Sequence, residues 1–258
     1  MRVVSLACSN TEIVVALGCG DWLVGVDDHS DYPEERVASL PKVGPDLQID
    51  VEKVAALKPD LVLASLTVPG HEKNLENLDN AGIPYIAPEP VSLNDVYKDI
   101  QTIADALGVS ERAVSLIASM QAKLSPPPQK KDSQRPSLLV QWWPKPVIAP
   151  GQQSWVHDLI EAAGGHSPLG HEEIKSRPMT DEEVAAMKPD AIILSWCGVK
   201  TEKYRPDVIY RNPAWQELDV VKKRRVFCVG EPFLGRPGPR LTEGYDALRK
   251  IVEELQDS

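Results

Sequence analysis

Long apolar runs are missing from this sequence of 258 residues. Among the longest are WLVGV at 22–26, LVLASL at 61–66 and AIILSW at 191–196, whereas a membrane-spanning helix needs about 20 consecutive apolar residues. Apolar residues still make up 42% of the chain, an ordinary share for a globular protein. The sequence therefore excludes a membrane-spanning helix, a coiled coil and a disordered chain.

Basic residues are too few for a nucleic-acid surface. The chain has 28 lysines and arginines against 38 aspartates and glutamates, which gives a net charge of −10. Proteins that bind DNA or RNA present a basic face to the phosphates. We therefore expect no nucleic-acid partner.

Catalytic and metal-binding signatures are missing as well. The sequence has no GxxxxGK[ST] phosphate loop, no GxSxG nucleophile elbow and no CxxC pair. HEEIK at 171–175 lacks the second histidine of a zinc protease, and the five histidines are scattered. We therefore expect no catalytic residues, no metal site and no cofactor of the protein's own.

Four cysteines leave the redox state open. They are Cys8, Cys19, Cys197 and Cys228. Two disulfides could form in three ways, and the sequence does not choose among them. The alternative is four reduced and mostly buried thiols, because free cysteine is commonly a small core residue.

No signal peptide precedes the first expected strand. Met1 and Arg2 lead directly into VVSL, without an apolar stretch and a small-residue cleavage site. This leaves open a cytoplasmic protein and an exported protein whose leader has been removed.

Short strand-like segments alternate with helical patterns along the chain. Strands are expected at 2–6, 22–26, 61–65, 84–87, 137–143, 147–150, 191–196 and 225–229. The first helix is expected to begin at Ser9 or Asn10, as the capping residue, and to end at Gly18. Further helices are expected at 50–58, 71–81, 93–107, 110–124, 155–163, 180–188, 206–218 and 239–256. This alternation predicts an α/β fold with mostly parallel sheets. The polar, proline-rich segment 125–137 predicts a loop.

An internal repeat is the most informative feature of the organisation. DVEKVAALKPDLVLAS at 50–65 matches TDEEVAAMKPDAIILS at 180–195 with a constant offset of 130 residues. The same offset pairs Glu72 with Glu202. Chance recurrence of a common helix-to-strand connection is the alternative to a true repeat.

We interpret the repeat as two lobes of related topology. The first comprises 1–109, the second comprises 125–258, and a connecting helix at 110–124 joins them. Open α/β sheets bind ligands at the carboxyl ends of their strands. This organisation therefore predicts a ligand cleft between the lobes.

Aromatic residues lie at the ends of the expected strands of the second lobe or in the loops after them. Trp142, Trp143, Trp196 and Phe233 all fall in such positions. Alternation along a strand sends one of the adjacent Trp142 and Trp143 inward and the other outward, so only one of them should reach a ligand. Core packing is the alternative for each. Together they predict a large, flat and partly apolar ligand.

Three further side chains have two interpretations each. Arg236 and Arg240 can donate to amides or a phosphate of a ligand, or they can pair with the local carboxylates Glu231 and Glu243. His29 can ligate a metal carried by the ligand, or it can make an ordinary loop hydrogen bond.

Several segments together resemble one known family. They are SNTEIVVALG at 9–18, GVDDHSDYPEE at 25–35, the KPD segments of the repeat, AGG at 163–165 and FLGRPGPRL at 233–241. In these segments the chain resembles the substrate-binding proteins of vitamin B12 ABC importers. Those proteins belong to a helical-backbone class that also serves siderophores and haem.

This resemblance implies a monomeric two-lobe receptor in the periplasm, with one long helix as a rigid spine. It implies a corrinoid such as cobalamin as the transported ligand, and an ABC transporter permease dimer as the partner. The residues implied or predicted at the ligand are Ser9, Asn10, His29, Ser30, Tyr32, Ser65, Leu66, Trp142, Trp143, Trp196, Cys197, Phe233, Arg236 and Arg240. Glu72 and Glu202 correspond to the family's permease-docking glutamates; solvated carboxylates at helix starts are the alternative.

Three other functions stay open. A receptor for a ferric siderophore or haem would belong to the same class. A cytoplasmic corrinoid-handling protein would use Cys8 and Cys197, which fall in predicted loops. A module that binds only other proteins is weakened by the scarcity of exposed apolar runs.

Overall fold

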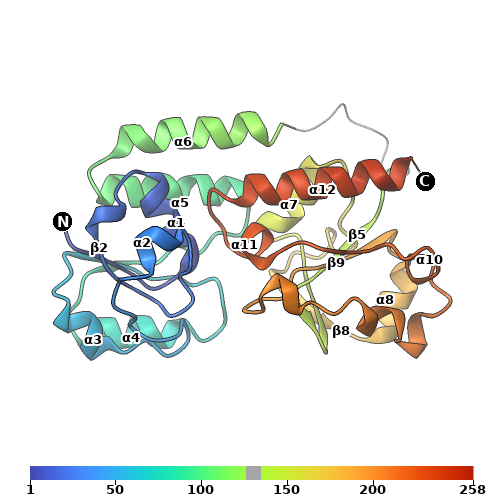
Figure 1. The fold of residues 1–258 in the computed structure, drawn as a ribbon, viewed down its shortest axis with the longest axis horizontal. Helices are drawn as coiled ribbons and strands as arrows, with labels where there is room; N and C mark the ends of the chain where they lie inside the picture. Colours follow the sequence, from blue (N-terminus) through green and yellow to red (C-terminus); the bar gives the residue numbers. More distant parts are fainter. Residues whose placement is uncertain (126–134, 258) are drawn as a thin grey trace. The chain divides into compact units, whose positions relative to one another are not determined.

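The computed structural model describes residues 1–125 and 135–257, and the chain forms two compact units. The first unit comprises Met1–Pro90 and Asn94–Met120, and the second comprises Val91–Leu93 and Gln121–Ser258. Each unit contains a parallel β-sheet and several helices (Figure 1), and the second unit contains a further, antiparallel sheet. The helix expected at 110–124 is present as α6 (Ser110–Lys123), and the division near residue 120 falls inside it. Most of the loop expected at 125–137 lies outside the described residues.

A parallel sheet forms the centre of the first unit. Its strands lie in the order β2-β1-β3-β4 and comprise β1 (Val3–Ser5), β2 (Leu23–Val26), β3 (Leu61–Leu63) and β4 (Tyr85–Ile86). The other elements before residue 125 are α1 (Cys8–Ala16), η1 (Gly20–Trp22), α2 (Glu34–Val37), α3 (Val51–Ala56), α4 (Glu72–Asn80), α5 (Leu93–Ala106) and α6. Val4, Val54 and Val62 are fully buried in one core cluster of this unit. Apolar residues on strand and helix thus cover each other, as parallel sheets require.

The second unit contains two small sheets. The parallel sheet has the order β10-β9-β5 and comprises β5 (Leu138–Gln141), β9 (Ala191–Leu194) and β10 (Val226–Cys228). The antiparallel sheet comprises β6 (Trp143–Pro144), β7 (Val147–Pro150) and β8 (Ser176–Met179). The helices are α7 (Trp155–Ala162), α8 (Asp181–Met187), η3 (Thr201–Lys203), α9 (Asp207–Tyr210), η4 (Pro213–Trp215), α10 (Asp219–Lys222), α11 (Glu231–Leu234) and α12 (Leu241–Gln256). The prediction of an α/β fold with mostly parallel sheets is confirmed.

Helix α12 packs against α7 in the second unit (Figure 1). Leu241, Tyr245, Leu248 and Val252 are buried along one side of α12, at the spacing of three to four residues that an amphipathic helix needs. No helix within the two described ranges is long and apolar enough to cross a membrane.

The sequence repeat corresponds to equivalent local structures. Helix α3 leads into β3 and α8 leads into β9. Each helix starts with a side-chain cap, from Asp50 and Thr180 respectively. Each connection contains a lysine in the left-handed region, with φ 49° at Lys58 and 47° at Lys188. Positive φ at a non-glycine residue is uncommon, so its occurrence at paired positions supports a true repeat.

The aspartates of the two KPD motifs make the same hydrogen bond. The backbone N–H of Arg2, just before β1, donates to Asp60 Oδ2 at 2.7 Å. The backbone N–H of Ser137, just before β5, donates to Asp190 Oδ2 at 2.8 Å. In each unit this bond joins the start of one strand to its parallel neighbour.

Two local predictions are wrong. The helix expected at 206–218 is divided into α9 and η4, because Asn212 caps a new turn that begins at Pro213; proline disfavours the helical conformation of the residue before it. The capping of the first helix by Ser9 or Asn10 is also wrong. The capping residue of α1 is Ala7, two residues before Ser9, and it makes no side-chain cap hydrogen bond.

Candidate functional site

Three loops meet at the carboxyl edge of the first unit's sheet. The start of α1 follows β1, residues 27–32 follow β2, and residues 65–67 follow β3. Because β1, β2 and β3 are parallel neighbours, these loops share the edge at which open α/β sheets bind ligands.

A buried hydrogen-bond network holds the first two loops. Thr11 Oγ1 donates to Ser5 Oγ at 2.8 Å and also lies 2.8 Å from Ser30 Oγ. Ser30 Oγ donates to the carboxylate of Asp27. Burial raises the pKa of Asp27, and the hydrogen bond from Ser30 opposes this shift. The edge is therefore fixed by its own polar side chains.

Most first-unit residues predicted at the ligand are buried. The exposed fractions are 8% for Ser9, 1% for Asn10, 2% for Ser30 and 6% for Ser65. Asn10 Nδ2 donates to the carbonyl of Ala64 at 2.6 Å, which ties α1 to the residue after β3. At the same edge, Leu66 is half-buried, whereas His29 and Tyr32 are exposed. The structure thus brings these residues to one edge, with few of them on its surface.

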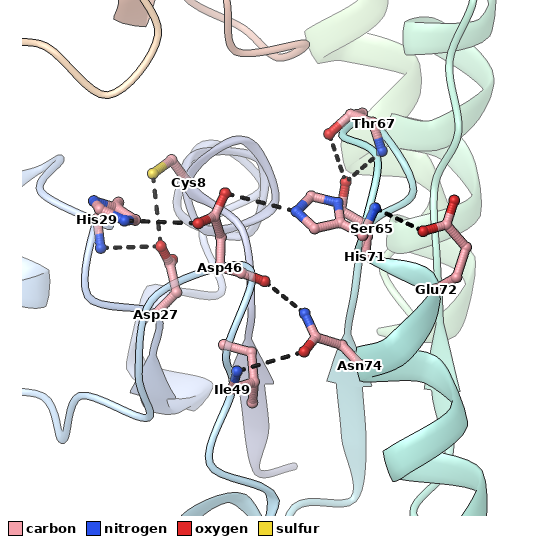
Figure 2. Close-up of polar contacts among 11 residues, drawn as sticks. Cys8, Asp27, His29, Asp46, Ile49, Ser65, Thr67, His71, Glu72 and Asn74 are labelled. Atoms are coloured by element: carbon pink, nitrogen blue, oxygen red, sulfur yellow. Dashed lines mark hydrogen bonds and ion pairs between the residues drawn. The ribbon is translucent and has the colours of Figure 1, made fainter.

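The backbone and the side chain of His29 contact two different aspartates. Its backbone N–H donates to Asp27 Oδ2 at 3.0 Å, and its Nε2 lies 3.6 Å from Asp46 Oδ1 (Figure 2). The side chain is 52% exposed, so the ring still reaches solvent.

The two glutamates of the proposed docking pair occupy similar positions. Glu72 is the first residue of α4 and is exposed; its Oε2 accepts a hydrogen bond from the Gly70 N–H at 2.8 Å. Glu202 is exposed in η3. Each unit therefore presents one acidic side chain where the repeat predicts it.

The carboxyl edge of the second parallel sheet brings together the predicted aromatic residues. Trp142 follows β5, and Trp196 follows β9. The Cys197 N–H donates to the carbonyl of Trp142 at 3.1 Å, which joins these two loops. Phe233 lies on α11, after β10, and is half-buried.

The tryptophans differ in their surroundings. Trp142 is half-buried with its ring 6.1 Å from that of Trp155, whereas Trp143 is 43% exposed, so the predicted alternation is confirmed. Trp196 is 6% exposed and belongs to the core cluster. Its ring lies 5.3 Å from that of Tyr204.

Sequence reasoning missed Gln141 and Ser195 at this edge. Both are fully buried, and the Ser195 N–H donates to the carbonyl of Gln141 at 3.0 Å. The side-chain amide of Gln141, the hydroxyl of Ser195 and the indole N–H groups of Trp142 and Trp196 have no hydrogen-bond partner within the described residues. An unsatisfied buried polar group costs about 1–3 kcal/mol, so this edge keeps hydrogen-bonding capacity for a ligand or water. The repeat pairs Ser195 with Ser65, which was a predicted ligand residue, so the repeat could have identified Ser195 as well.

Arg236 and Arg240 make local ion pairs, which was one of their two interpretations from the sequence. Arg236 is 7% exposed, and its Nε lies 3.1 Å from Glu231 Oε2. Arg240 Nε lies 3.3 Å from Glu243 Oε1, and the Arg240 guanidinium lies 4.7 Å from the centroid of the Phe233 ring. These contacts join the segment between α11 and α12 to both helices.

Tyr204 connects Trp196 to α11. Its hydroxyl donates to the carbonyl of Trp196 at 3.3 Å and accepts from the Glu231 N–H at 3.0 Å. Burial raises the pKa of Tyr204 to about 12. The hydroxyl therefore stays protonated at neutral pH.

All four cysteines are free thiols. Cys19 is buried and Cys8 is half-buried, whereas Cys197 and Cys228 are exposed. The expectation of mostly buried thiols is therefore wrong, because the ends of β9 and β10 leave two of them at the surface.

The chemistry of both edges suits binding. Within residues 1–125 and 135–257 no three histidine, cysteine, aspartate or glutamate side chains are grouped to hold a metal ion. The groups brought together are aromatic rings, neutral polar side chains and arginines held by ion pairs. Such groups recognise a ligand by shape, stacking and hydrogen bonds.

The sequence of this chain matches the periplasmic binding protein family over residues 3–232. The chain therefore belongs to that family. It is 34% identical to an uncharacterised ABC transporter substrate-binding lipoprotein, YvrC, of Bacillus subtilis, across 97% of this chain and 79% of that protein. It is accordingly a substrate-binding protein of the kind that serves ABC transporters.

More distant relatives have named ligands. A vitamin B12-binding protein of Vibrio cholerae is 26% identical across 99% of this chain and 89% of that protein. The apo structure of the periplasmic haem-binding protein RhuT from Roseiflexus sp. RS-1 is 27% identical, with a TM-score of 0.79 over 99% of this chain and 98% of that one. The structure of the vitamin B12-binding protein BtuF of Vibrio cholerae has a TM-score of 0.76 at 24% identity, over 100% and 98% of the two chains. This last match shows the fold alone.

Proposed function

We propose that this protein captures a corrinoid, such as cobalamin, and delivers it to an ABC importer. The observation that carries the proposal is the carboxyl edge of the second parallel sheet. There, the half-buried indole of Trp142 accompanies the buried polar groups of Gln141 and Ser195, which have no hydrogen-bond partner within the described residues. Wide indole faces suit a flat, partly apolar macrocycle, and buried polar atoms suit the amide groups at its rim. The similarity to the Vibrio B12-binding protein supports this ligand.

The proposed mechanism is capture between two lobes, 1–109 and 125–258, with the helix at 110–124 as a stiff connection. The fixed hydrogen-bond network at the first edge and the ion pairs after β10 support a preformed site. A preformed site loses little conformational entropy on binding, so more of the contact energy contributes to affinity.

Delivery is proposed to use Glu72 and Glu202. Both are exposed, one in each unit, and acidic side chains of this kind pair with basic residues on a partner. In this proposal the protein is a monomer of the periplasm and docks onto a permease dimer. It has no cofactor of its own and catalyses no reaction.

Haem is the second candidate ligand. The similarity to the haem-binding protein RhuT supports it, at 27% identity and a TM-score of 0.79. A porphyrin is also flat and partly apolar, so the same aromatic edge would suit it.

Ligand titrations separate these candidates. We expect cyanocobalamin to bind with micromolar or tighter affinity in isothermal titration calorimetry and to quench tryptophan fluorescence, whereas haemin and a ferric hydroxamate bind at least tenfold more weakly. Binding of haemin alone, or of the hydroxamate alone, would contradict the corrinoid proposal.

A matched pair of variants tests the aromatic edge. Trp142 is half-buried at the proposed site, whereas the adjacent Trp143 is 43% exposed and points to the opposite side. Trp142→Ala should weaken cyanocobalamin binding about three- to tenfold, and the control Trp143→Ala should leave it within twofold. Unchanged binding by Trp142→Ala, or an equal loss in both variants, would contradict the proposed aromatic edge.

A further inference from the structure

One carboxylate lies between two histidines in the first unit. Asp46 Oδ1 is 3.6 Å from Nε2 of His29, and Asp46 Oδ2 is 3.6 Å from Nε2 of His71 (Figure 2). The two histidines differ in exposure, because the His29 side chain is 52% exposed and the His71 side chain 5%. Asp46 thus connects a loop at the candidate ligand edge with a buried residue beside α4.

The backbone of Asp46 holds the same helix. Asn74 Nδ2 donates to the carbonyl of Asp46 at 2.5 Å, and the Ile49 N–H donates to Asn74 Oδ1 at 3.4 Å. Asn74 is 6% exposed. Since His71 and Asn74 are three residues apart at the start of α4, they lie on one face of the helix. The Asn74 amide attaches that face to the loop of residues 46–49, and the His71 imidazole lies 3.6 Å from the Asp46 carboxylate of the same loop.

Glu72 lies between these two attachment points and points to solvent. It is exposed, and its Oε2 accepts from the Gly70 N–H at 2.8 Å. Gly70 has φ +103°, and a side chain at this position would meet Leu47 Cδ2 at 3.3 Å. The Glu72 carboxylate is therefore held by the turn before α4, and the glycine of that turn lies close to Leu47.

Two exposed apolar side chains accompany Glu72. Leu47, which follows Asp46 and lies against Gly70, is 44% exposed, and Val68 is 41% exposed. The carbonyl of Val68 accepts from the His71 N–H at 3.2 Å, so Val68 belongs to the same turn. An acidic group flanked by apolar side chains fits a protein surface with a basic residue in an apolar surround.

The charge on Asp46 supports these contacts. Contact with the His71 side chain lowers the pKa of Asp46, burial opposes this shift, and the nearby His29 adds to it. The carboxylate is therefore ionised at neutral pH and attracts either imidazole when that ring is protonated.

We infer that Asp46 is a positioning residue for Glu72, because it fixes the start of α4. Glu72, Leu47 and Val68 then form a preformed docking surface. The partner of this surface is a basic, partly apolar patch of an importer permease. The inference rests on the proposed function. Preformation favours docking because the acidic side chain loses little freedom when it pairs.

The test measures docking to the importer of the same organism, reconstituted in nanodiscs, by biolayer interferometry. The variants are Asp46→Asn, Asn74→Ala, Glu72→Gln and the two double variants with Glu72→Gln. Asp50→Asn is the matched control, because it removes the same charge from the same unit at the cap of α3. Thermal unfolding and cyanocobalamin titration check that each variant is folded.

We expect Asp46→Asn and Asn74→Ala to weaken docking about three- to tenfold, and Asp50→Asn to leave it within twofold. In the Glu72→Gln background each change should weaken docking less than it does in the unmodified protein, because part of its effect acts through Glu72. A purely structural role would lower the midpoint of thermal unfolding and weaken docking equally in both backgrounds. That result, or unchanged docking by Asp46→Asn, would overturn the inference.

Hydrogen exchange provides a second measurement that needs no partner. Asp46→Asn should speed amide exchange at residues 70–75 and leave α3 unchanged; unchanged exchange at 70–75 would also overturn the inference. If Glu72→Gln does not weaken docking, the docking role of Glu72 and this inference fail together, whereas corrinoid capture stands on its own titration.

Discussion

Replacing Tyr204 with phenylalanine tests how the second unit holds its candidate edge. The variant keeps the ring that lies 5.3 Å from Trp196 and removes only the hydroxyl. That hydroxyl donates to the carbonyl of Trp196 and accepts from the Glu231 N–H. The change therefore isolates two hydrogen bonds at a residue that is 6% exposed.

We expect Tyr204→Phe to lower the free energy of unfolding by about 2 kcal/mol at pH 7. A hydrogen bond contributes a net of about 1 kcal/mol, and a buried group that loses its partner costs about 1–3 kcal/mol. Urea unfolding followed by tryptophan fluorescence measures the difference. Tyr85→Phe is the control, because its hydroxyl bond to Asp79 is exposed, and it should change stability by less than about 0.5 kcal/mol.

The pH dependence of the same variant gives a second check. The pKa of Tyr204 is about 12 in the folded protein and about 10 in an unfolded chain. A raised pKa means that the stabilisation is fully present below pH 10 and is lost as the pH rises towards 12. Two pH units correspond to about 2–3 kcal/mol. The difference between the unmodified protein and Tyr204→Phe should therefore be constant from pH 6 to 9 and shrink above pH 10.

Two results would refute this reasoning. A loss below about 0.5 kcal/mol at pH 7 would mean that the hydroxyl contributes little to the edge. A stability difference that grows above pH 10 would mean that Tyr204 ionises more easily in the folded protein than in the unfolded chain.

Three further predictions concern other parts of the chain. Asn10→Ala should lower the free energy of unfolding by about 1–3 kcal/mol in urea titration, because the carbonyl of Ala64 loses its buried donor; a neutral effect would contradict this. Lys188→Gly should raise the free energy of unfolding by up to about 1 kcal/mol, because glycine adopts the positive φ of 47° without strain. A lower free energy of unfolding would contradict this backbone conformation. Iodoacetamide should label Cys197 in the folded protein but Cys19 only after unfolding, since Cys19 is buried and burial raises its pKa; peptide mass spectrometry distinguishes the two, and early labelling of Cys19 would contradict its burial.

The arrangement of strands and helices could be predicted because its signals are local. β-branched runs such as VVS at Val3–Ser5 and AIIL at Ala191–Leu194 are short, apolar and bounded by turn residues. The repeat added long-range information, since it aligned α3–β3 with α8–β9. The segment 206–218 failed because its apolar periodicity was read without the effect of Pro213 on the residue before it.

The candidate site was predicted only in part, because burial depends on tertiary structure. The sequence placed Asn10 and Ser30 after strands, but not the hydrogen bonds that bury them. It identified Trp196 as aromatic, but not its packing in the core. Gln141 has no motif that distinguishes it from a surface glutamine, and only the structure shows that its amide is enclosed.

The adjacent rings of Trp142 and Trp155 have an optical consequence. Their centroids are 6.1 Å apart and their planes are inclined by 32°, so the electronic transitions of the two indoles couple. Circular dichroism of the folded chain should therefore contain an exciton signal from this pair. A ligand that contacts Trp142 would change this exciton signal. Circular dichroism could therefore detect binding at this edge without an added label.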